Sequence, residues 1–275
     1  HEGCVRGHQE YTCRVRQRRK ENDCAMGIII KTEKQIELIR ESCRLLAIVH
    51  QELEEFIRPG ISTKEIDIKG DSCIRKLGGI PNFLHYNGYP ASICVSVNDE
   101  VVHGIPNKHR ILEEGDIVSL DAGMIYQGYH SDEARTHGVG KISAEAQKLI
   151  DVTRESFFAG LKMAKAGNHL FDISNAIAAY VKPYGYGIVR ELVGHGVGTK
   201  LHEDPQIPNF AQTRRGPKLR PGMTLAVEPM INMGRADVEW LDDNWTVVTE
   251  DGSWSAHYEN TILITEGEPE ILTRC

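Results

Sequence analysis

Two carboxylates eleven residues apart, Asp121 and Asp132, are the first candidates for chemistry, and Asp121 stands in an otherwise apolar run. Residues 126–128, Tyr-Gln-Gly, are typical of a turn between two antiparallel strands, and such a hairpin would bring both acids together. The run around Asp121 carries no Lys or Arg, so the ionised form of Asp121 is costly there unless a cation lies beside it. A lone strand acid at a solvated sheet edge would need no cation, and residues further along the chain decide between these interpretations.

Three later residues are polar groups in unexpected places. His195 lies between two glycines, which indicates backbone that passes close to another segment. Glu228 and Glu259 each stand in an apolar strand pattern. The turn at Asp251-Gly252 is expected to fold the strand 245–249 back onto the strand that carries Glu259.

Taken singly, a histidine of this kind is more often a satisfied core residue, and a strand glutamate more often faces water. The set favours a different interpretation, because four converging carboxylates repel one another strongly in a protein interior. Two divalent cations about 3.5–4 Å apart would neutralise them, as in two-metal hydrolytic sites. Oxygen-rich ligation with one imidazole suits Mn, Fe(II), Co or Zn.

Two helices and a strand are predicted to precede the first acid. Thr32 and Gln35 form a capping box, and helical spacing of apolar residues continues from there until Pro59-Gly60. Ser62 and Glu65 cap a second helix, which is expected to end at Gly78-Gly79. A strand is predicted over residues 91–97.

The second half repeats this plan, with helices predicted over 143–166 and 170–185 and then a strand and a histidine. Equivalent residues in the two halves are 107 positions apart, which predicts an internal duplication. The pairs that share this offset are Gly60 with Gly167, Gly78 with Gly185, Gly115 with Gly222, and Asp121 with Glu228.

Composition places the chain among ordinary globular proteins. At 275 residues, 40% of them hydrophobic, it is long enough to bury about three quarters of its unfolded surface. The net charge of −7 argues against general binding of nucleic acids. The seven cysteines are scattered and odd in number, which is typical of reduced thiols in a cytoplasmic protein.

Residues 1–25 are polar and show no strand or helix periodicity, so a disordered extension is expected there, followed by one catalytic domain over 26–275. No apolar run reaches the roughly 20 residues that span a bilayer, and no signal peptide is evident, so no membrane partner is predicted.

From Met26 to Arg274 the chain resembles the type I methionine aminopeptidases of the bacterial kind. The resemblance rests on the segments already described together with Val-His-Gly-Ile-Pro at 102–106 and Leu-His-Glu-Asp-Pro-Gln at 201–206. It implies the α+β pita-bread fold, in which two pseudo-symmetric halves form a curved antiparallel sheet, backed by helices, around a dinuclear metal centre.

The resemblance also implies roles for the candidate ligands. Asp132 and Glu259 would bridge two metal ions, Asp121 would belong to one ion, and His195 and Glu228 to the other. A water between the ions would then attack the carbonyl of residue one, because its pKa is lowered. The implied reaction removes the N-terminal methionine of nascent polypeptides when the second residue is small.

Further residues receive implied roles from the same motifs. Glu228 would carry a proton, His202 would stabilise the oxyanion, and His103 would contact the scissile amide. Phe83 and Leu201 depart from the family pattern of a cysteine and an aromatic residue, which affects pocket shape and not chemistry. The remaining histidines 85, 109, 130, 137 and 257 are interpreted as structural or solvated, and the methionine pocket is assigned to Tyr86, Tyr89, Cys94 and Trp245.

Two alternatives stay open at this point. A proline-specific peptidase of the same fold shares the five ligands, but such enzymes carry a large N-terminal domain, and only 25 residues precede Met26 here. A non-catalytic relative that binds RNA or the ribosome would be expected to have lost ligands. A monomer is expected, and weak ribosome contact is an added hypothesis for the basic residues Arg214, Arg215, Lys218 and Arg220.

Overall fold

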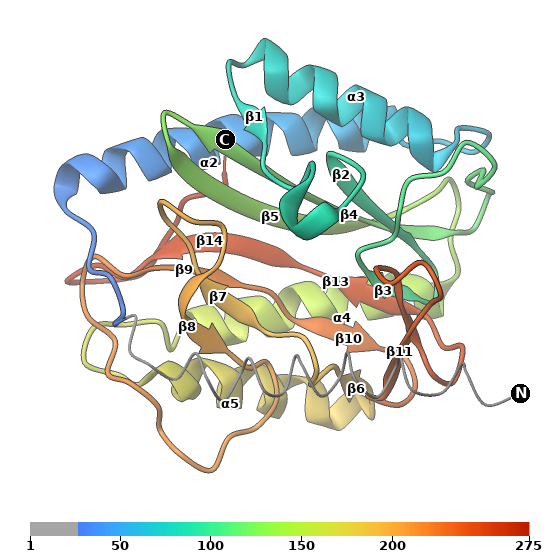
Figure 1. Cartoon of the computed structure of the whole chain (residues 1–275). Coiled ribbons are helices and arrows are strands. Elements are labelled where there is room, and N and C mark those ends of the chain that lie inside the picture. The colour runs from blue at the N-terminus through green and yellow to red at the C-terminus, as the bar shows by residue number, and fades with distance from the viewer. Residues whose placement is uncertain (1–26, 275) are drawn as a thin grey trace, which may run out of the picture.

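A nine-stranded antiparallel sheet forms the centre of the computed structural model, which describes residues 27–274 (Figure 1). The disorder expected for residues 1–25 falls outside the described residues. The strands follow one another in the order β1 (Ile80–Pro81), β4 (Ile117–Tyr126), β5 (Tyr129–Gly138), β14 (Glu259–Leu263), β9 (Thr224–Val227), β7 (Gly194–Gly196) and β8 (Glu203–Ile207), while β2 (Ile93–Val97) pairs with β4 and β15 (Glu270–Ile271) with β14.

The hairpin predicted around residues 126–128 is the longest element of this sheet. Strands β4 and β5 pair over their whole length, from Ile117 opposite Gly138 to Tyr126 opposite Tyr129. The two turn residues, 127 and 128, have φ angles of 49° and 83°. Positive φ at both positions is what a type I′ turn requires, and such a turn matches the twist of the strands.

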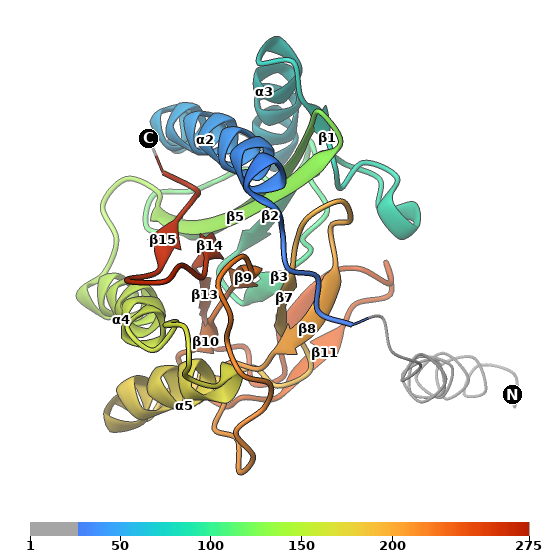
Figure 2. The ribbon, with the colours of Figure 1, turned by 90° about the vertical axis from the view of Figure 1, so that its left-hand side faces the viewer.

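The predicted helix starts are confirmed. Helix α2 (Glu33–Phe56) begins after Thr32 and α3 (Thr63–Lys76) after Ser62, each with both hydrogen bonds of a capping box. The apolar faces of α2 and α3 pack on β2 and β4, in a core that includes Leu53 and Ile74. Helices α4 (Ala144–Leu161) and α5 (Leu170–Val181) lie on the other half of the molecule, as the rotated view shows (Figure 2).

Helix α4 is shorter than predicted. The sequence pattern extended it to residue 166, but it ends at Leu161, and residues 162–166 form tight turns. The backbone N–H of Gly167 donates to the carbonyl of Leu219 at 3.0 Å, and Asn168 Nδ2 donates to the carbonyl of Met163 at 3.0 Å. These contacts replace the bonds of a further helical turn and lead the chain out of the helix.

The 107-residue offset appears in the backbone hydrogen bonds of the two halves. Gly60 N donates to Leu112 O at 2.8 Å, and Gly167 N, 107 positions later, donates to Leu219 O at 3.0 Å. Isolated bridges between 62 and 111 and between 169 and 218 repeat the same offset. All six glycines of the predicted pairs have φ between 72° and 99°, a region where L side chains are strained. The two halves are therefore pseudo-symmetric, as expected.

One predicted pairing is wrong. The strand at 245–249, observed as β12 (Val247–Thr249), does not fold onto the strand of Glu259. It pairs with β3 (Glu100–Val102) and β11 (Val238–Trp240) in a separate three-stranded sheet. The physical reason is that β5 and β9 already occupy both edges of β14.

The strand of Glu259 is also broken. Its first part, β13 (Ser255–His257), leaves the main sheet at Tyr258 and pairs with β10 (Met230–Asn232), which in turn pairs with β6 (Gly187–Ile188). Glu228 and Pro229 make the matching break between β9 and β10. Within residues 27–274, the structure contains no helix long and apolar enough to cross a membrane.

Candidate metal centre and active site

Five neighbouring strands or their ends each supply one polar residue to the same region. In sheet order, β4 carries Asp121, β5 carries Asp132, β14 begins with Glu259, β9 leads directly into Glu228, and β7 has His195 at its centre. These are the residues that the sequence predicted as metal ligands. The strand order thus brings together groups that lie up to 138 positions apart along the chain.

The register of the hairpin places both aspartates on one face. Asp121 lies opposite Ala134, and Gly123, two residues on, lies opposite Asp132. Because side chains alternate along a strand, the two carboxylates are diagonal neighbours on the same side of the sheet. A Cβ atom at Gly123 would collide with the side chain of Asn82. Glycine is therefore needed beside Asp132.

The glycines around His195 have the role expected of them. A Cβ on Gly194 would collide with the carbonyl oxygen of Ala226 on β9, and one on Gly196 with that of Asp204 on β8. Glycine therefore lets β7 fit between its two neighbours. The ring nitrogen Nδ1 of His195 donates to the carbonyl of Gly196 at 2.9 Å, because a carbonyl oxygen can only accept.

This hydrogen bond fixes the tautomer of His195 and leaves the lone pair of Nε2 free. Nε2 lies 3.5 Å from Asp132 Oδ2 and 3.6 Å from Glu228 Oε1. A neutral imidazole whose other nitrogen is held by a carbonyl is the usual form of a histidine metal ligand.

The carboxylates of the cluster lie close together in a buried site, where the charge of Arg135 lowers the pKa of Glu259 but burial outweighs it. Burial raises the pKa values of Asp121, Glu228 and Glu259 well above their ordinary range, and the charge of Asp132 raises each of them further. Buried oxygens on Asp121 (Oδ1), Asp132 (Oδ1) and Glu259 (Oε1) have no hydrogen-bond partner. Such oxygens would otherwise be satisfied, so the site is suited to bind a positive ion.

Donor atoms in this cluster are close enough to share an ion. One ligand atom each from Asp132, His195 and Glu259 lie within 4.8 Å of one another, and all three residues are buried. Carboxylate oxygens with an imidazole nitrogen form a donor set that suits divalent transition metals. The residues present therefore fit a divalent metal ion.

His257 belongs to the same cluster, although sequence analysis left it as structural or solvated. Its Nε2 atom lies 3.5 Å from Glu228 Oε2, and a second group of close donor atoms joins His257 with Glu228 and Glu259. The pairing of β10 with β13 sets Met230 opposite His257. His257 stands two residues before Glu259, but the strand is broken at Tyr258, so strand alternation alone did not signal this contact.

The predicted site residues all line one cavity of about 230 Å³. The carboxylate–histidine cluster forms one part of its wall, and apolar and aromatic side chains form another. The cavity thus joins the cluster to a pocket that can hold an apolar side chain. Sequence analysis missed several lining residues, for which only apolar character was visible: Val102, Leu192, Val193 and Met230, together with Asn87.

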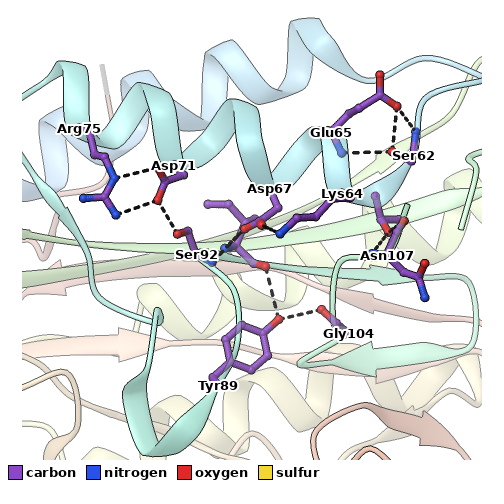
Figure 3. A network of polar contacts seen from close by, with 12 residues as sticks. Ser62, Lys64, Glu65, Asp67, Asp71, Arg75, Tyr89, Ser92, Gly104 and Asn107 are labelled. Carbon is purple, nitrogen blue, oxygen red and sulfur yellow. Dashed lines mark hydrogen bonds and ion pairs between the residues drawn. The ribbon is translucent and has the colours of Figure 1, made fainter. Parts of the chain in front are cut away.

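The aromatic wall of the pocket is built from Tyr89 and Trp245, whose rings meet edge to face with centroids 5.1 Å apart. The hydroxyl of Tyr89 donates to the carbonyl of Gly104 at 2.8 Å (Figure 3). In the same network, Asp67 on α3 accepts hydrogen bonds from the backbone of Ser92 and Ile93 at 2.9 and 3.1 Å. These bonds hold the segment between Tyr89 and β2 against the helix, which makes this wall rigid.

Phe83 and Leu201 complete the apolar side of the pocket. Both are buried, and they pack in one cluster with Tyr89 and Cys94. Neither contributes a polar atom. Their departure from the family pattern therefore changes the shape of the pocket and leaves the polar groups unaltered.

Two further histidines, His103 and His202, face the cavity as neutral groups. Burial lowers the pKa of His103 to about 4, and burial together with the nearby His195 lowers the pKa of His202 to about 3. The rings of His195 and His202 have centroids 4.2 Å apart, and that of His103 lies 6.3 Å from Trp245. A neutral imidazole can donate one hydrogen bond to a substrate without adding charge.

A buried cluster that suits a divalent cation, beside an apolar pocket and two neutral hydrogen-bond donors, is the arrangement of a metal-dependent hydrolase. Comparison with known protein families shows which group of metal-dependent hydrolases the chain belongs to. The model of metallopeptidase family M24 matches residues 37–266, and the chain belongs to this family.

The relatives found by sequence are methionine aminopeptidases. That of Clostridium acetobutylicum is 51% identical over 248 residues, which cover 90% of this chain and 99% of the relative. Methionine aminopeptidase 1 of Bacillus subtilis is 53% identical over 247 residues, with 90% and 99% covered.

Solved structures show the same relationship. The crystal structure of methionine aminopeptidase from Thermotoga maritima superposes with a TM-score of 0.89 at 44% identity, covering 90% of this chain and 100% of that one. An Xaa-Pro dipeptidase from Bacillus anthracis shares the fold at a TM-score of 0.73 and 26% identity, covering 90% of this chain and 62% of its own. The expected pita-bread architecture is therefore confirmed.

Proposed function

We propose that this protein is a methionine aminopeptidase, which hydrolyses the first peptide bond of polypeptides that begin with methionine and continue with a small residue. The observation that carries the proposal is the single cavity in which the ligand cluster meets a rigid apolar pocket. The names of relatives that are 51% and 53% identical over nearly their whole length support it.

The metal centre is proposed to hold two divalent ions, with Asp132 and Glu259 shared between them. Asp121 would serve one ion, and His195 and Glu228 the other. The proposed ion is Mn, Fe(II), Co or Zn, as the mixed oxygen and imidazole donors suggest. When bound, such ions supply a nucleophile near neutral pH and polarise the carbonyl that it attacks.

The position of Asp121 suits recognition of a free N-terminus. Asp121 lies directly opposite Cys94, which lines the apolar pocket, so its carboxylate stands where the pocket meets the cluster. A methionine side chain in the pocket would bring its own α-amine to this end of the cavity. Peptide bonds inside a chain offer no amine there, which explains proposed exopeptidase action.

Three residues are proposed to act on the reacting groups. Glu228 carries a proton between the nucleophile and the departing amine, since its side chain lines the cavity beside the other candidate ligands. His202 donates a hydrogen bond to the carbonyl oxygen as negative charge develops on it. His103 contacts the scissile amide from the opposite wall. Tyr86, Tyr89, Cys94 and Trp245 hold the methionine side chain.

The alternative activities are less well supported. The proline-specific enzyme found by structure is 26% identical, about half the identity of the methionine aminopeptidases. A non-catalytic relative would have no need to keep the five proposed ligands, all of which this chain retains. We propose the N-termini of nascent chains as substrates, in the cytoplasm and with a monomeric enzyme; the buried cysteines 43, 73 and 94 are free, in keeping with a reducing compartment.

Ribosome contact is proposed as an addition to this activity. Arg214, Arg215, Lys218 and Arg220 are all exposed and stand in one loop before β9. Clustered cations of this kind favour weak, salt-dependent contact with a polyanion such as ribosomal RNA.

The deciding experiment uses protein stripped of metal by chelation. Turnover of Met-Ala-Ser is measured after Mn, Fe(II), Co and Zn are added back separately, with Ala-Pro and Leu-Ala-Ser as comparison substrates. Release of methionine with at least one metal, and not with the chelated sample, is the expected result. Cleavage of Ala-Pro in preference to Met-Ala-Ser would support the proline-specific alternative, and no cleavage with any metal would overturn the proposal.

A further inference from the structure

A buried ion pair links the segment before α2 to the loop that carries His202. Lys31 Nζ lies 2.6 Å from Glu203 Oε2, and the exposed fractions of the two side chains are 4% and 3%. The other oxygen of Glu203, Oε1, accepts from the backbone N–H of Lys200 at 3.2 Å. The ion pair joins residues 172 positions apart, so it is a tertiary contact and not a local one.

The surroundings of Lys31 are shaped to admit it. Its backbone N–H donates to the carbonyl of Gly222 at 2.9 Å. A Cβ on Gly222 would lie 2.9 Å from the carbonyl oxygen of Lys31, and a Cβ on Gly198 would lie 2.7 Å from Lys31 Cε and 2.7 Å from Glu203 Oε1. Two glycines therefore leave room for the lysine and its partner, which distinguishes this contact from an ordinary surface ion pair.

The same contact fixes the backbone on both sides of His202. Glu203 follows His202 directly and begins β8, where it pairs with Gly196 of β7. Before His202, Gly198 N donates to Lys200 O at 3.1 Å. The loop between β7 and β8 is thus closed by Glu203 and its partner Lys31, with the ring of His202 held against that of His195.

Stability alone does not account for burying this pair. Removing two charges from water costs several kcal/mol, and apolar residues of similar volume often give equal or greater stability in such places. The buried pair does favour one arrangement of the loop, because any arrangement that separates the two charges leaves each of them buried without a partner. Geometry matters most where the neighbouring residue must meet a reacting atom.

We propose that Lys31 is a positioning residue, which through its ion pair with Glu203 holds His202 where its hydrogen bond meets the substrate carbonyl. This inference rests on the function proposed above for His202. It makes the segment from residue 27 to α2 a support for the loop that carries His202. Lys31 itself touches no substrate, and it acts only through the loop.

The first test compares Lys31→Met with a matched control, Lys69→Met. Lys69 also forms an ion pair of 2.6 Å, with Glu52, but that pair is exposed and lies away from the cavity. With Met-Ala-Ser as substrate, Lys31→Met should lower kcat by about 10- to 100-fold with little change in KM, whereas Lys69→Met should leave both unchanged. An active parent enzyme with unaltered kcat in Lys31→Met would overturn this inference and leave the proposed function standing. An inactive parent enzyme would instead refute the proposed function.

Removing one partner leaves a buried charge unpaired, so Lys31→Met could fail by unfolding. The variant that combines Lys31→Met with Glu203→Gln leaves no unpaired charge and retains an acceptor for Lys200. It should melt close to the parent protein and still show the lower kcat. Recovery of the parent kcat in this folded variant would contradict the positioning role.

A double-mutant cycle with His202 separates positioning from a general structural effect. In a His202→Ala background, the added Lys31→Met/Glu203→Gln change should lower kcat less than twofold, because the group that it positions is gone. A further loss as large as that in the parent background would show that the ion pair acts independently of His202, and the inference would be wrong.

Discussion

The hydroxyl oxygen of Tyr86 lies 2.7 Å from Nδ1 of His202. Burial raises the pKa of the Tyr86 hydroxyl, and burial lowers the pKa of His202 to about 3, so that both groups are neutral at physiological pH. We infer that the phenol donates to Nδ1, which places the single proton of the imidazole on Nε2. Tyr86, assigned from the sequence to the methionine pocket, therefore also sets the tautomer in which His202 can donate to a substrate oxygen.

Replacing Tyr86 by phenylalanine tests this relationship. The ring and its apolar contacts remain in Tyr86→Phe, so KM for Met-Ala-Ser should change little. Loss of the bond to Nδ1 should lower kcat by about tenfold, equivalent to about 1.4 kcal/mol, which is the scale of one hydrogen bond. If KM rises and kcat stays constant, Tyr86 serves only as a pocket wall.

Removal of the metal, or of one ligand charge, should abolish turnover. Asp121→Asn keeps the shape of the side chain but lowers the negative charge of the cluster, and metal affinity should fall with it. Asp242→Asn, an exposed position, is the matched control. Metal content and kcat/KM are measured on the same samples. Full activity in a demonstrably metal-free sample would sink the metallopeptidase mechanism.

The stabilising effect of metal should grow with pH. Because burial raises the pKa values of Asp121, Glu228 and Glu259, the metal-free folded protein keeps protons that the unfolded chain has released. Their contribution to folding stability is fully present below an unfolded pKa of about 4 and is lost as the pH rises through the raised pKa values. A bound cation requires these carboxyl groups to be deprotonated and stabilises their charged forms. It therefore offsets the folding stability that the metal-free protein loses as the pH rises.

The measurement is the increase in Tm on adding Mn, taken at about pH 5.5 and about pH 7.5 with the ion in excess. The increase should be larger at the higher pH. Buried histidines that do not bind the ion titrate alike with and without metal, and they cancel in the difference. An equal increase at both values would show that the carboxylates are not protonated in the metal-free state.

Much of this fold was predictable because its signals are local. The capping boxes at Thr32 and Ser62, the hairpin turn at 127–128 and the glycines at positive φ each depend on a few adjacent residues. The 107-residue offset then predicted that the chain has two similar halves. The same offset separates equivalent backbone hydrogen bonds in the structure. The candidate metal ligands could also be predicted, because a carboxylate in an apolar strand is costly to bury unless a cation neutralises it.

The misplaced elements depend on which strand edges are free, and no short stretch of sequence records that. The strand 247–249 pairs with β3 because β14 has no open edge. The break at Tyr258, whose N–H donates to Pro229 O at 3.2 Å, sends β13 to β10 and so turns His257 toward Glu228. The contact between His257 and Glu228 could not be predicted without this long-range pairing.

That contact leads to a prediction for His257. Its Nε2 lies 3.5 Å from Glu228 Oε2, so His257 should orient Glu228, the carboxylate proposed to bind metal and to carry a proton. Partners of this kind typically contribute 10- to 100-fold to metal affinity or activity. His257→Leu should therefore bind metal and turn over Met-Ala-Ser about 10- to 100-fold less well, while the exposed control His109→Leu should match the parent. Equal metal affinity and kcat in both variants would return His257 to a purely structural role.

Selectivity for the residue after methionine should follow from the walls of the cavity. With the methionine side chain between Tyr89 and Trp245, the second residue lies beside His103 and the glycine-bordered strand of His195. His103 has a φ of 59°, and the next residue, Gly104, is fixed by hydrogen bonds. Its N–H donates to Ser96 Oγ, and its carbonyl oxygen accepts from the N–H of Val95 and the hydroxyl of Tyr89. This wall has little freedom to move away from a large side chain.

A second residue that displaces the scissile bond by about 1 Å can cost about 100-fold in rate. Peptides Met-X-Ser with X as Ala, Gly, Ser or Pro should therefore be cleaved far faster than those with Leu, Lys or Phe, and kcat/KM for the series measures the difference. The change should appear mainly in kcat, because the apolar pocket still binds the methionine side chain of every peptide. Leu-Ala-Ser serves as the control for that pocket. Equal rates for X as Ala and as Leu, or release of N-terminal leucine as fast as methionine, would contradict the assignment as a methionine-specific enzyme.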